Sequence, residues 1–415
     1  MMPEIRLKEE RMAAQSCVIV GAGPAGMMLG YLLARAGIPV TVVEKHPDFL
    51  HDFRGDTIHP STLEAFADLG LLEDFLKLPH QKAPVLQAEI GGVQTKIADF
   101  SRIPARCRFI AFMPQWDFLD FLAGRAAAFP DFRLMMGVEV AGLVQSGGQI
   151  RGIRIREGGV EHELPADLVI GADGRNSVTR RDAALPVTDF GSQVDVLWLR
   201  LSRQEGDPVL AMSHAGPQQG LVLIDRGDYW QCGYVIRKGS YDDLKARGLP
   251  AFRESLAALA PLAPERFEEI QGWDQVHLLS VRMDRLERWW RPGLLCIGDA
   301  AHAMSPIGGF GVNLAVQDAI AAANILAAPL GSGRMGPDDL ARVERRRRFP
   351  TRATQKLQLM MRRKRPVVGE ANAAVSQEKP SGPPKFLRVI GRWPVLSHLA
   401  GRLIGLGFRP ERVRI

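Results

Sequence analysis

The chain has 415 residues, of which 46% are hydrophobic and 24% charged, so it can bury a large core and wholesale disorder is excluded. Its formal net charge of +7 is unevenly distributed, because the segment from Arg342 onward carries 19 Lys and Arg against 4 Asp and Glu. The residues before it are net acidic. The basic charge therefore belongs to the C-terminal segment, and without a nucleic-acid-binding signature we expect no nucleic-acid partner.

Four cysteines lie far apart, with neither a CxxC pair nor a Cys/His cluster: Cys17, Cys107, Cys232 and Cys296. This spacing argues against a disulfide framework and against a metal site. The first residues are charged and lack the apolar core of a secretion signal. We therefore expect a reducing, cytoplasmic location.

A glycine-rich loop between two apolar strands is the first motif in chain order. Residues 17–20 (CVIV) predict a buried strand, residues 27–36 a helix, and residues 40–43 a second strand that ends in Glu44. A G-x-G-x-x-G pattern joins the first strand to the helix. Its glycines are Gly21, Gly23 and Gly26.

The three glycines have separate tasks. The first permits a tight turn, the second lets the backbone approach a pyrophosphate, and the third allows close contact between helix and strand. Unpaired N–H groups at the helix N-terminus favour the negative charge of a phosphate. Glu44 is placed to accept hydrogen bonds from ribose hydroxyls. The motif predicts a dinucleotide site, but alone it does not separate FAD from NAD.

The next part of the chain alternates between helical and strand-like patterns. Helices are expected at 60–71 and 115–128. Three stretches (134–144, 150–156 and 162–164) predict a small antiparallel meander. A buried strand at 168–170 then leads into the second motif, an Asp-Gly turn at Asp173. Alternating, aromatic-rich strands over 190–285 predict a separate antiparallel layer.

A third motif follows an apolar strand at 294–297. Gly298 and Asp299 end this strand, and a glycine-rich loop then opens a helix over about 312–327. An Asp at a strand end can bind a ribityl hydroxyl, and the N–H groups of such a loop can face a phosphate or an electron-rich ring. His302 lies in the same stretch, but a histidine near a turn is more often structural than catalytic.

Together the three motifs resemble those of the class A flavoprotein monooxygenases, the aromatic-ring hydroxylases related to para-hydroxybenzoate hydroxylase. GAGPAG resembles the dinucleotide fingerprint of that family. GADGRNSVTR resembles its Asp-Gly motif, which is held to serve both FAD and NAD(P)H. RWWRPGLLCIGDAAHAMSPIGGFGVNLAVQDA resembles its Gly-Asp motif and the flavin loop that follows. The resemblance runs from about Cys17 to Leu330 in the family's order and spacing.

The resemblance implies an α/β fold in three parts. A Rossmann-like FAD-binding domain is discontinuous, over 16–189 and 286–341. An antiparallel-sheet substrate domain is inserted at 190–285, and a basic helical C-terminal segment covers 342–415.

The resemblance also implies which residues contact a non-covalent FAD. Arg54 and Gln115 match positions at which the family contacts the cofactor, and Val140 matches a position near the adenine. No metal is expected, and no catalytic residue is assigned. The expected FAD-binding residues are Gly21, Ala22, Gly23, Pro24, Ala25, Gly26, Glu44, Lys45, Arg54, Gln115, Val140, Asp173, Gly298, Asp299, Pro306, Gly309, Gly311, Val312 and Asn313.

One residue departs from the family pattern. Phe310 stands between the last two glycines of the flavin loop, where the family usually has Gln. Backbone donors survive that change, so FAD binding is still expected. The packing beside the flavin is expected to differ, and with it the substrate pocket or the mobility of the flavin.

By resemblance, NADH or NADPH reduces the FAD, dioxygen adds to it, and a flavin hydroperoxide delivers one oxygen atom to a small aromatic substrate, by default a phenol. The substrate is expected between the flavin and the inserted sheet. Two alternatives stay open: a reductase or epoxidase of a lipophilic, isoprenoid-like substrate on the same fold, and a non-catalytic flavoprotein. A homodimer is also left open. Candidate wall residues are Trp198, Met212, His214 and Tyr234.

The C-terminal segment ends in two amphipathic stretches. Apolar residues at helical spacing are interleaved with basic ones over 385–404, and Pro394 predicts two short helices rather than one. A basic amphipathic helix can lie on anionic lipid. Because large apolar side chains are unfavourable in water and the rest of the chain is acidic, we expect packing on the body or on a partner subunit. Membrane contact is not favoured.

Overall fold

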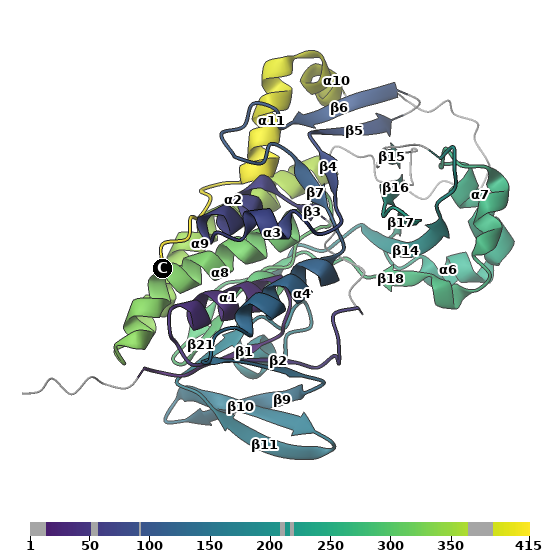
Figure 1. Cartoon of the computed structure of the whole chain (residues 1–415). Coiled ribbons are helices and arrows are strands. Elements are labelled where there is room, and N and C mark those ends of the chain that lie inside the picture. The colour runs from purple at the N-terminus through teal and green to yellow at the C-terminus, as the bar shows by residue number, and fades with distance from the viewer. Residues whose placement is uncertain (1–13, 51–56, 91–92, 208–211, 216–219, 364–384) are drawn as a thin grey trace, which may run out of the picture.

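The computed structural model describes residues 14–50, 57–90, 93–207, 212–215, 220–363 and 385–415. Its centre is a six-stranded sheet in the order β20-β21-β12-β1-β2-β8 (Figure 1). The strands from β21 to β8 are parallel, and β20 pairs antiparallel with β21. Their bounds are β1 (Cys17–Val20), β2 (Val40–Glu44), β8 (Phe132–Met136), β12 (Leu168–Gly171), β20 (Trp290–Arg291) and β21 (Leu294–Cys296). The Val- and Ile-rich runs of β1, β2 and β12 suit strands covered on both faces.

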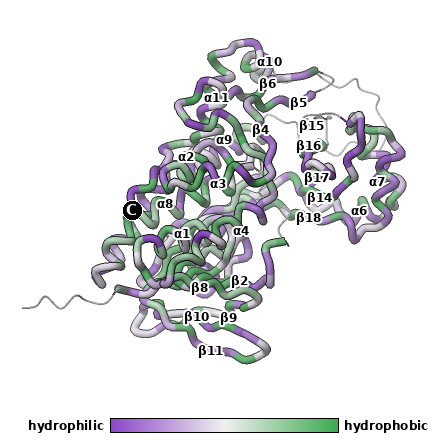
Figure 2. Tube along the Cα trace, viewed as in Figure 1, coloured by the Kyte–Doolittle hydropathy of each residue, from purple (hydrophilic) through white to green (hydrophobic). Residues whose placement is uncertain are grey.

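Helices cover one face of this sheet and a three-stranded antiparallel sheet covers the other (Figure 1). On the helical face, α1 packs against both α4 and α8. Hydrophobic stretches gather where these helices meet the sheet (Figure 2). The bounds are α1 (Pro24–Arg35), α4 (Gln115–Ala126), α8 (Phe310–Gly331), β9 (Glu139–Ser146), β10 (Gln149–Glu157) and β11 (Val160–Pro165). The predicted βαβ unit and meander are therefore present, except that residues 134–136, predicted as the start of the meander, belong to β8 and pair with β2.

Among the described residues, α8 is the one helix that is long and apolar enough to cross a membrane. That test uses length and composition alone. Most of its apolar stretch is buried inside the body, against α1 and α9 (Pro337–Arg363).

A seven-stranded sheet forms the second large layer, in the order β18-β14-β17-β16-β15-β5-β6. Its bounds are β5 (Val85–Ile90), β6 (Val93–Asp99), β14 (Val194–Ser202), β15 (Met212–Ala215), β16 (Gly220–Asp225), β17 (Tyr229–Arg237) and β18 (His277–Leu279). The sheet is thus not confined to residues 190–285, because the hairpin β5-β6 joins it through a parallel pairing of β5 with β15. That pairing joins residues more than a hundred positions apart, and no local pattern records it.

One face of the seven-stranded sheet is covered by α6 (Tyr241–Ala246) and α7 (Leu249–Ala257), which lie on the side away from the parallel sheet (Figure 1). Leu197, Trp230 and Tyr234 are buried in the core under these helices. Side chains alternate along a strand, so Trp198 and Arg200 of β14 point to the opposite face. That face lies toward the parallel sheet and its helices.

Smaller elements connect the two layers. They are β3 (Thr57–Ile58), β4 (Gln81–Ala83), β7 (Ile110–Phe112), β13 (Val187–Asp189), β19 (Asp284–Leu286), α2 (Pro60–Asp68), α3 (Leu72–Phe75), α5 (Val178–Asp182) and three short 3₁₀ turns at Pro264–Glu269, Trp273–Gln275 and Gly298–Ala300. β3, β7 and β4 form one small sheet, and β13 and β19 pair antiparallel.

The C-terminal segment contains the two short helices that the sequence predicts, α10 (Lys385–Arg392) and α11 (Pro394–Leu406). α11 lies on β6 and α2 at the top of Figure 1. A Cβ on Gly401 would collide with the carbonyl oxygen of Asp99, so the helix can approach the strand closely because this residue is glycine. The last residues return to the body, where Arg412 pairs with Glu64 and Asp68 of α2.

Candidate functional site

Three loops meet at the carboxyl ends of the parallel strands. They follow β1, β12 and β21, which are neighbours in the sheet, so the three predicted motifs converge although the first begins at Gly21 and the third at Gly298. A Cβ on Gly21 would lie 2.5 Å from the carbonyl oxygen of Ala172, and one on Gly298 would lie 3.0 Å from Cβ of Ala25. The carboxyl edge of an open parallel sheet is where such folds bind ligands.

The start of α1 fits a pyrophosphate. Within the described structure this helix has no side-chain cap and no acidic residue in its first turn, and Pro24 stands at its first position. A Cβ on Gly23 would meet nothing within 4 Å, so the space in front of the helix is open. In contrast, a Cβ on Gly26 would overlap the carbonyl oxygen of Gly21. The N–H groups of the first turn are therefore available to an anion.

Glu44 lies at the end of β2, beside this loop. Its Oε2 accepts a hydrogen bond from the N–H of Ala22 at 2.9 Å, and its Oε1 accepts one from the N–H of His46 at 3.1 Å. Each carboxylate oxygen can accept further hydrogen bonds, so ribose hydroxyls remain acceptable partners. Lys45 next to it is exposed. Val140 is buried in β9, which begins beside Glu44, and Arg54 lies outside the described residues.

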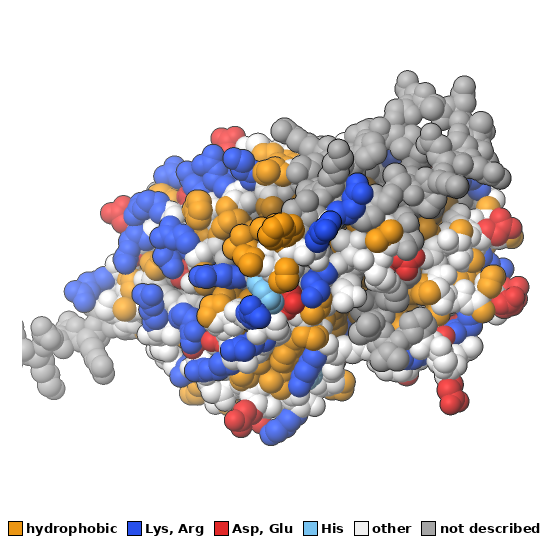
Figure 3. All heavy atoms as spheres, turned by 90° about the horizontal axis from the view of Figure 1, so that it is seen from above, with side chains coloured by type: hydrophobic (Ala, Val, Ile, Leu, Met, Phe, Trp, Pro, Cys, Tyr) orange, Lys and Arg blue, Asp and Glu red, His pale blue; other side chains and the backbone are white. Residues whose placement is uncertain are grey.

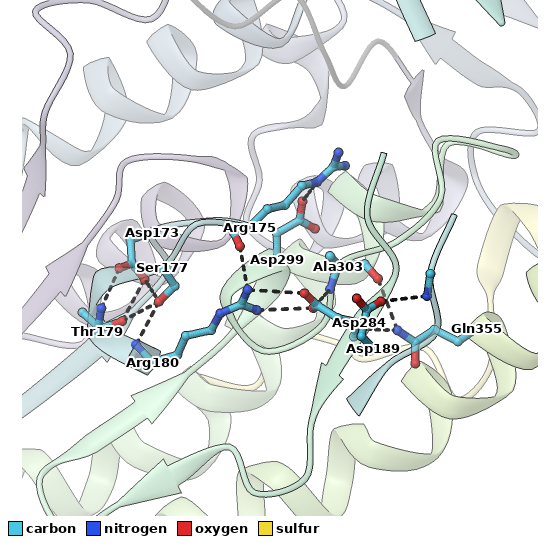
Figure 4. A network of polar contacts seen from close by, with 11 residues as sticks. Asp173, Arg175, Ser177, Thr179, Arg180, Asp189, Asp284, Asp299, Ala303 and Gln355 are labelled. Atoms are coloured by element: carbon cyan, nitrogen blue, oxygen red, sulfur yellow. Dashed lines mark hydrogen bonds and ion pairs between the residues drawn. The ribbon is translucent and has the colours of Figure 1, made fainter. Parts of the chain in front are cut away.

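Asp173 organises its own turn (Figure 4). Its Oδ1 accepts hydrogen bonds from Ser177 Oγ (2.6 Å) and Thr179 Oγ1 (2.8 Å), and its Oδ2 accepts one from the N–H of Thr179 (2.9 Å). Arg180 donates to both carboxylate oxygens of Asp284 and to the carbonyl oxygen of Arg175. We conclude that Asp173, which the sequence places among the cofactor-binding residues, holds the Asp-Gly turn in shape.

Arg175 links this turn to the third motif through a hydrogen bond. Its Nε donates to Asp299 Oδ2 at 2.9 Å, and the two side chains lie side by side in Figure 4. Asp299 keeps 28% of its side-chain surface exposed, so it can still accept hydrogen bonds from a ligand. Arg175 is absent from the predicted site residues, although it stands inside the motif that the sequence analysis quotes.

Asn313 holds the flavin loop at the start of α8. Its Oδ1 accepts hydrogen bonds from the N–H of His59 (2.7 Å) and from Thr62 Oγ1 (2.8 Å), and its Nδ2 donates to the carbonyl oxygens of Thr57 and Gly309. The side chain is thus fully used in joining two segments. The first turn of α8 has neither a side-chain cap nor an acidic residue in the described structure, so its backbone N–H groups are available. Pro306, Gly311 and Val312 are partly exposed nearby.

Phe310, the departure from the family pattern, packs inward. Its ring lies edge-to-face on His59 with the ring centroids 5.9 Å apart, and it folds over Gly308. His59 is 1% exposed, and its Nδ1–H donates a hydrogen bond to the carbonyl oxygen of Ile404 at 2.9 Å. Burial lowers the pKa of His59 to about 4, so the imidazole is neutral. The packing of Phe310 on His59 therefore supports the flavin loop on its buried side.

His302 belongs to a buried ion-pair network beneath the same loops. Its Nε2 lies 2.6 Å from Asp318 Oδ2, while Arg347 Nε donates to Asp318 Oδ1 at 2.8 Å and the N–H of Gly298 donates to Oδ2 at 3.1 Å. Burial works to raise the pKa of Asp318, but His302 and Arg347 hold it below the usual range. These contacts support the structural interpretation of His302.

The open face of the seven-stranded sheet lies opposite α4. Gln115 is buried at the first turn of α4, and the ring of its neighbour Trp116 lies 5.8 Å from the guanidinium of Arg200. Trp198, two residues before Arg200, shares that face and lies over Gly233.

The prediction that Tyr234 lines this space is wrong, because Tyr234 packs on Phe252 in the core. The side chains of Met212 and His214 lie outside the described structure.

This fold and convergence of loops define a flavin-dependent protein. A family model described as "FAD binding domain" matches residues 14–356, and the chain belongs to that family of FAD-dependent aromatic monooxygenases. FAD is its cofactor and it is an enzyme of the monooxygenase class.

Individual relatives agree with this assignment. The chain is 32% identical over 398 residues to 6-methylpretetramide 4-monooxygenase of Streptomyces rimosus, with 95% of this chain and 93% of the relative covered. It is 26% identical over 359 residues to 3-(3-hydroxy-phenyl)propionate/3-hydroxycinnamic acid hydroxylase 2 of Burkholderia vietnamiensis, covering 84% of this chain and 62% of the relative. The fold is similar to that of the Diels-Alderase PyrE3 (TM-score 0.73, 20% identity, 96% and 82% of the two chains). A likeness of fold alone therefore does not decide the reaction.

Proposed function

We propose that this enzyme uses NADH or NADPH to insert one oxygen atom of dioxygen into a phenolic aromatic molecule. The observation that carries the proposal is the convergence of three loops at one sheet edge, opposite the sheet face that bears Trp198. The names of two relatives, one acting on 6-methylpretetramide and one on a hydroxyphenyl acid, support an aromatic substrate.

The residues of the chain would bind and orient the reactants. The N-terminus of α1 and the open space at Gly23 would hold the pyrophosphate, and Glu44 and Asp299 would accept hydrogen bonds from ribose and ribityl hydroxyls. The N-terminus of α8, with its backbone N–H groups, would stabilise negative charge on the flavin ring. Bound FAD supplies the electron transfer from reduced nicotinamide to dioxygen, one atom of which enters the substrate while the other leaves as water.

Aromatic side chains on the open sheet face would position the substrate. Trp198 offers a flat apolar surface, and Trp116 with Arg200 closes the side toward α4. Exclusion of water from this space keeps the reactive oxygen for the substrate.

The experiment follows oxygen from gas to product. The enzyme is screened with 6-methylpretetramide and simple phenols under labelled dioxygen, and the product mass is measured. One labelled oxygen atom per product, with matched consumption of NAD(P)H, supports the proposal. Reduction without oxygen uptake would instead indicate a reductase, and a flavin that NADH and NADPH fail to bleach without oxygen would indicate a non-catalytic flavoprotein. A cytoplasmic location is part of this proposal and is tested by cell fractionation.

A further inference from the structure

An exposed apolar patch lies on α11 and on the residue before it, on the side that faces away from the body. Trp393, Val395 and Leu399 are 61%, 74% and 61% exposed. The sequence argument expects the apolar side chains of this segment to pack on the body or on a partner subunit, and in this chain these three do not pack on the body. Exposed apolar side chains that gather on one surface mark an interaction site more often than scattered ones do.

The helical spacing explains why α11 has two distinct faces. Ser397, Gly401 and Gly405 recur every four residues and are buried against β6, Phe100 and α2. Val395 and Leu399 are also four residues apart and lie on the opposite face. The body therefore already occupies the small-residue face, and the apolar face is left without a partner among the described residues.

Cations surround the patch. Arg388 and Arg392 of α10 and Arg402 of α11 are exposed, and residues 385–406 contain no acidic residue. The loop that carries Arg102, Arg106 and Arg108 lies beside α11, since its Ile103 belongs to the cluster on which Ile404 packs. All three arginines are exposed. Figure 3 shows hydrophobic side chains beside Lys and Arg side chains on this face.

Asp99, an acidic group beside α11, is already paired. Asp99 accepts hydrogen bonds from Ser101, pairs with Lys96 at 3.3 Å, and lies 3.5 Å from the ring of His398. Two copies of this face would repel each other, because both are cationic. An anionic surface that also has an apolar interior complements the patch.

We propose that α10 and α11 dock this enzyme on the surface of an anionic lipid bilayer. Val395 and Leu399 enter the boundary between head groups and acyl chains, Trp393 lies at the head-group level, and the arginines contact lipid phosphates. The body stays in water above the bilayer, since α8 is buried in its core. The proposal does not depend on the substrate or the reaction.

Vesicle co-sedimentation of the full-length, FAD-loaded enzyme tests the proposal. Vesicles of phosphatidylcholine alone are compared with vesicles that also contain phosphatidylglycerol. The enzyme is expected to sediment with the anionic vesicles and to remain in the supernatant with the neutral ones. Added salt should weaken the binding, because it screens exposed charges beyond about 10 Å at 0.1 M.

Two sets of variants separate the apolar and the charged contributions. Trp393→Ser combined with Val395→Ser and Leu399→Ser should reduce vesicle affinity at least about tenfold. Arg388→Gln combined with Arg392→Gln and Arg402→Gln should reduce it about a hundredfold, at roughly one factor of five per arginine. All variants must retain their FAD content and unfolding temperature.

Matched controls change exposed residues of the same type elsewhere. Val160→Ser removes a 56% exposed side chain on β11, and Arg133→Gln with Arg151→Gln removes exposed cations on β8 and β10. These variants should bind vesicles as the unaltered enzyme does. The proposal is overturned if the unaltered enzyme stays in the supernatant, or if the serine variant binds undiminished. It is also overturned if the patch instead drives a concentration-dependent dimer that the serine variant abolishes.

Discussion

Arg175 and Asp299 join two motifs that are 124 residues apart in the chain, through a hydrogen bond of 2.9 Å from Nε to Oδ2. Arg175 belongs to the Asp-Gly turn after β12, and Asp299 lies in the 3₁₀ turn that follows the neighbouring strand β21. Arg180 fixes the other end of the turn, because its guanidinium donates hydrogen bonds to Asp284 and to the carbonyl oxygen of Arg175. The pair therefore sets the position of the carboxylate that faces the proposed ribityl chain.

Substitution of Asp299 and substitution of Arg175 should weaken FAD binding to different degrees. Asp299→Ala deletes the proposed ligand of FAD and should weaken FAD binding about tenfold or more, measured by quenching of flavin fluorescence. Arg175→Gln keeps the carboxylate but loses its orientation, so a smaller effect of about 1 kcal/mol is expected. The double variant should show that the two effects are coupled. Unchanged FAD affinity in Asp299→Ala would remove this residue from the site.

Two glycines of the first loop should respond differently to substitution. Gly23→Val places a side chain in open space at a backbone conformation that any residue adopts, so the fold should remain intact while FAD binding is lost. Gly26→Ala, the control, forces a methyl group onto the carbonyl oxygen of Gly21 and should destabilise the fold by about 1–3 kcal/mol. FAD content and thermal unfolding are measured for both. Full FAD occupancy in Gly23→Val would contradict the assignment of the loop.

Folding stability should fall as the solution is acidified, through His59. Its pKa is lowered by burial to about 4 from 6.5, so between these values the unfolded chain binds a proton that the folded chain does not. Stability is therefore complete above pH 6.5 and decreases toward pH 4, by up to about 3 kcal/mol. Denaturant unfolding across this range measures the slope. His59→Asn should flatten it, and the exposed His162→Asn should leave it unchanged.

Trp198 and Tyr234 should separate substrate binding from folding. Trp198→Ala removes the aromatic surface from the open sheet face and should raise KM for an aromatic substrate about tenfold, with FAD affinity unchanged. Tyr234→Phe alters the buried core on the other face, so KM should not change. Steady-state kinetics with the best substrate of the screen provide the measurement. A KM that moves with Tyr234 and not with Trp198 would place the substrate elsewhere.

The sequence by itself determined the βαβ unit, the order of the three loops and the family. These depend on local rules: an apolar run is a strand, a glycine permits a turn, and a helix N-terminus attracts a phosphate. The two C-terminal helices also follow from local information, because Pro394 cannot continue a helix.

The tertiary structure alone decided which partner each side chain meets. Trp198 and Tyr234 look equivalent in alternating strands, and packing of α6 and α7 on one face buried the second and left the first on the open side. The hairpin β5-β6 pairs with β15, which lies far along the chain, and His302 forms a hydrogen bond with Asp318 of α8. α11 packs on β6 through its glycine-bearing face, and Trp393, Val395 and Leu399 are therefore exposed. Such contacts depend on which surfaces close over one another, and their energies come from residues distant in sequence.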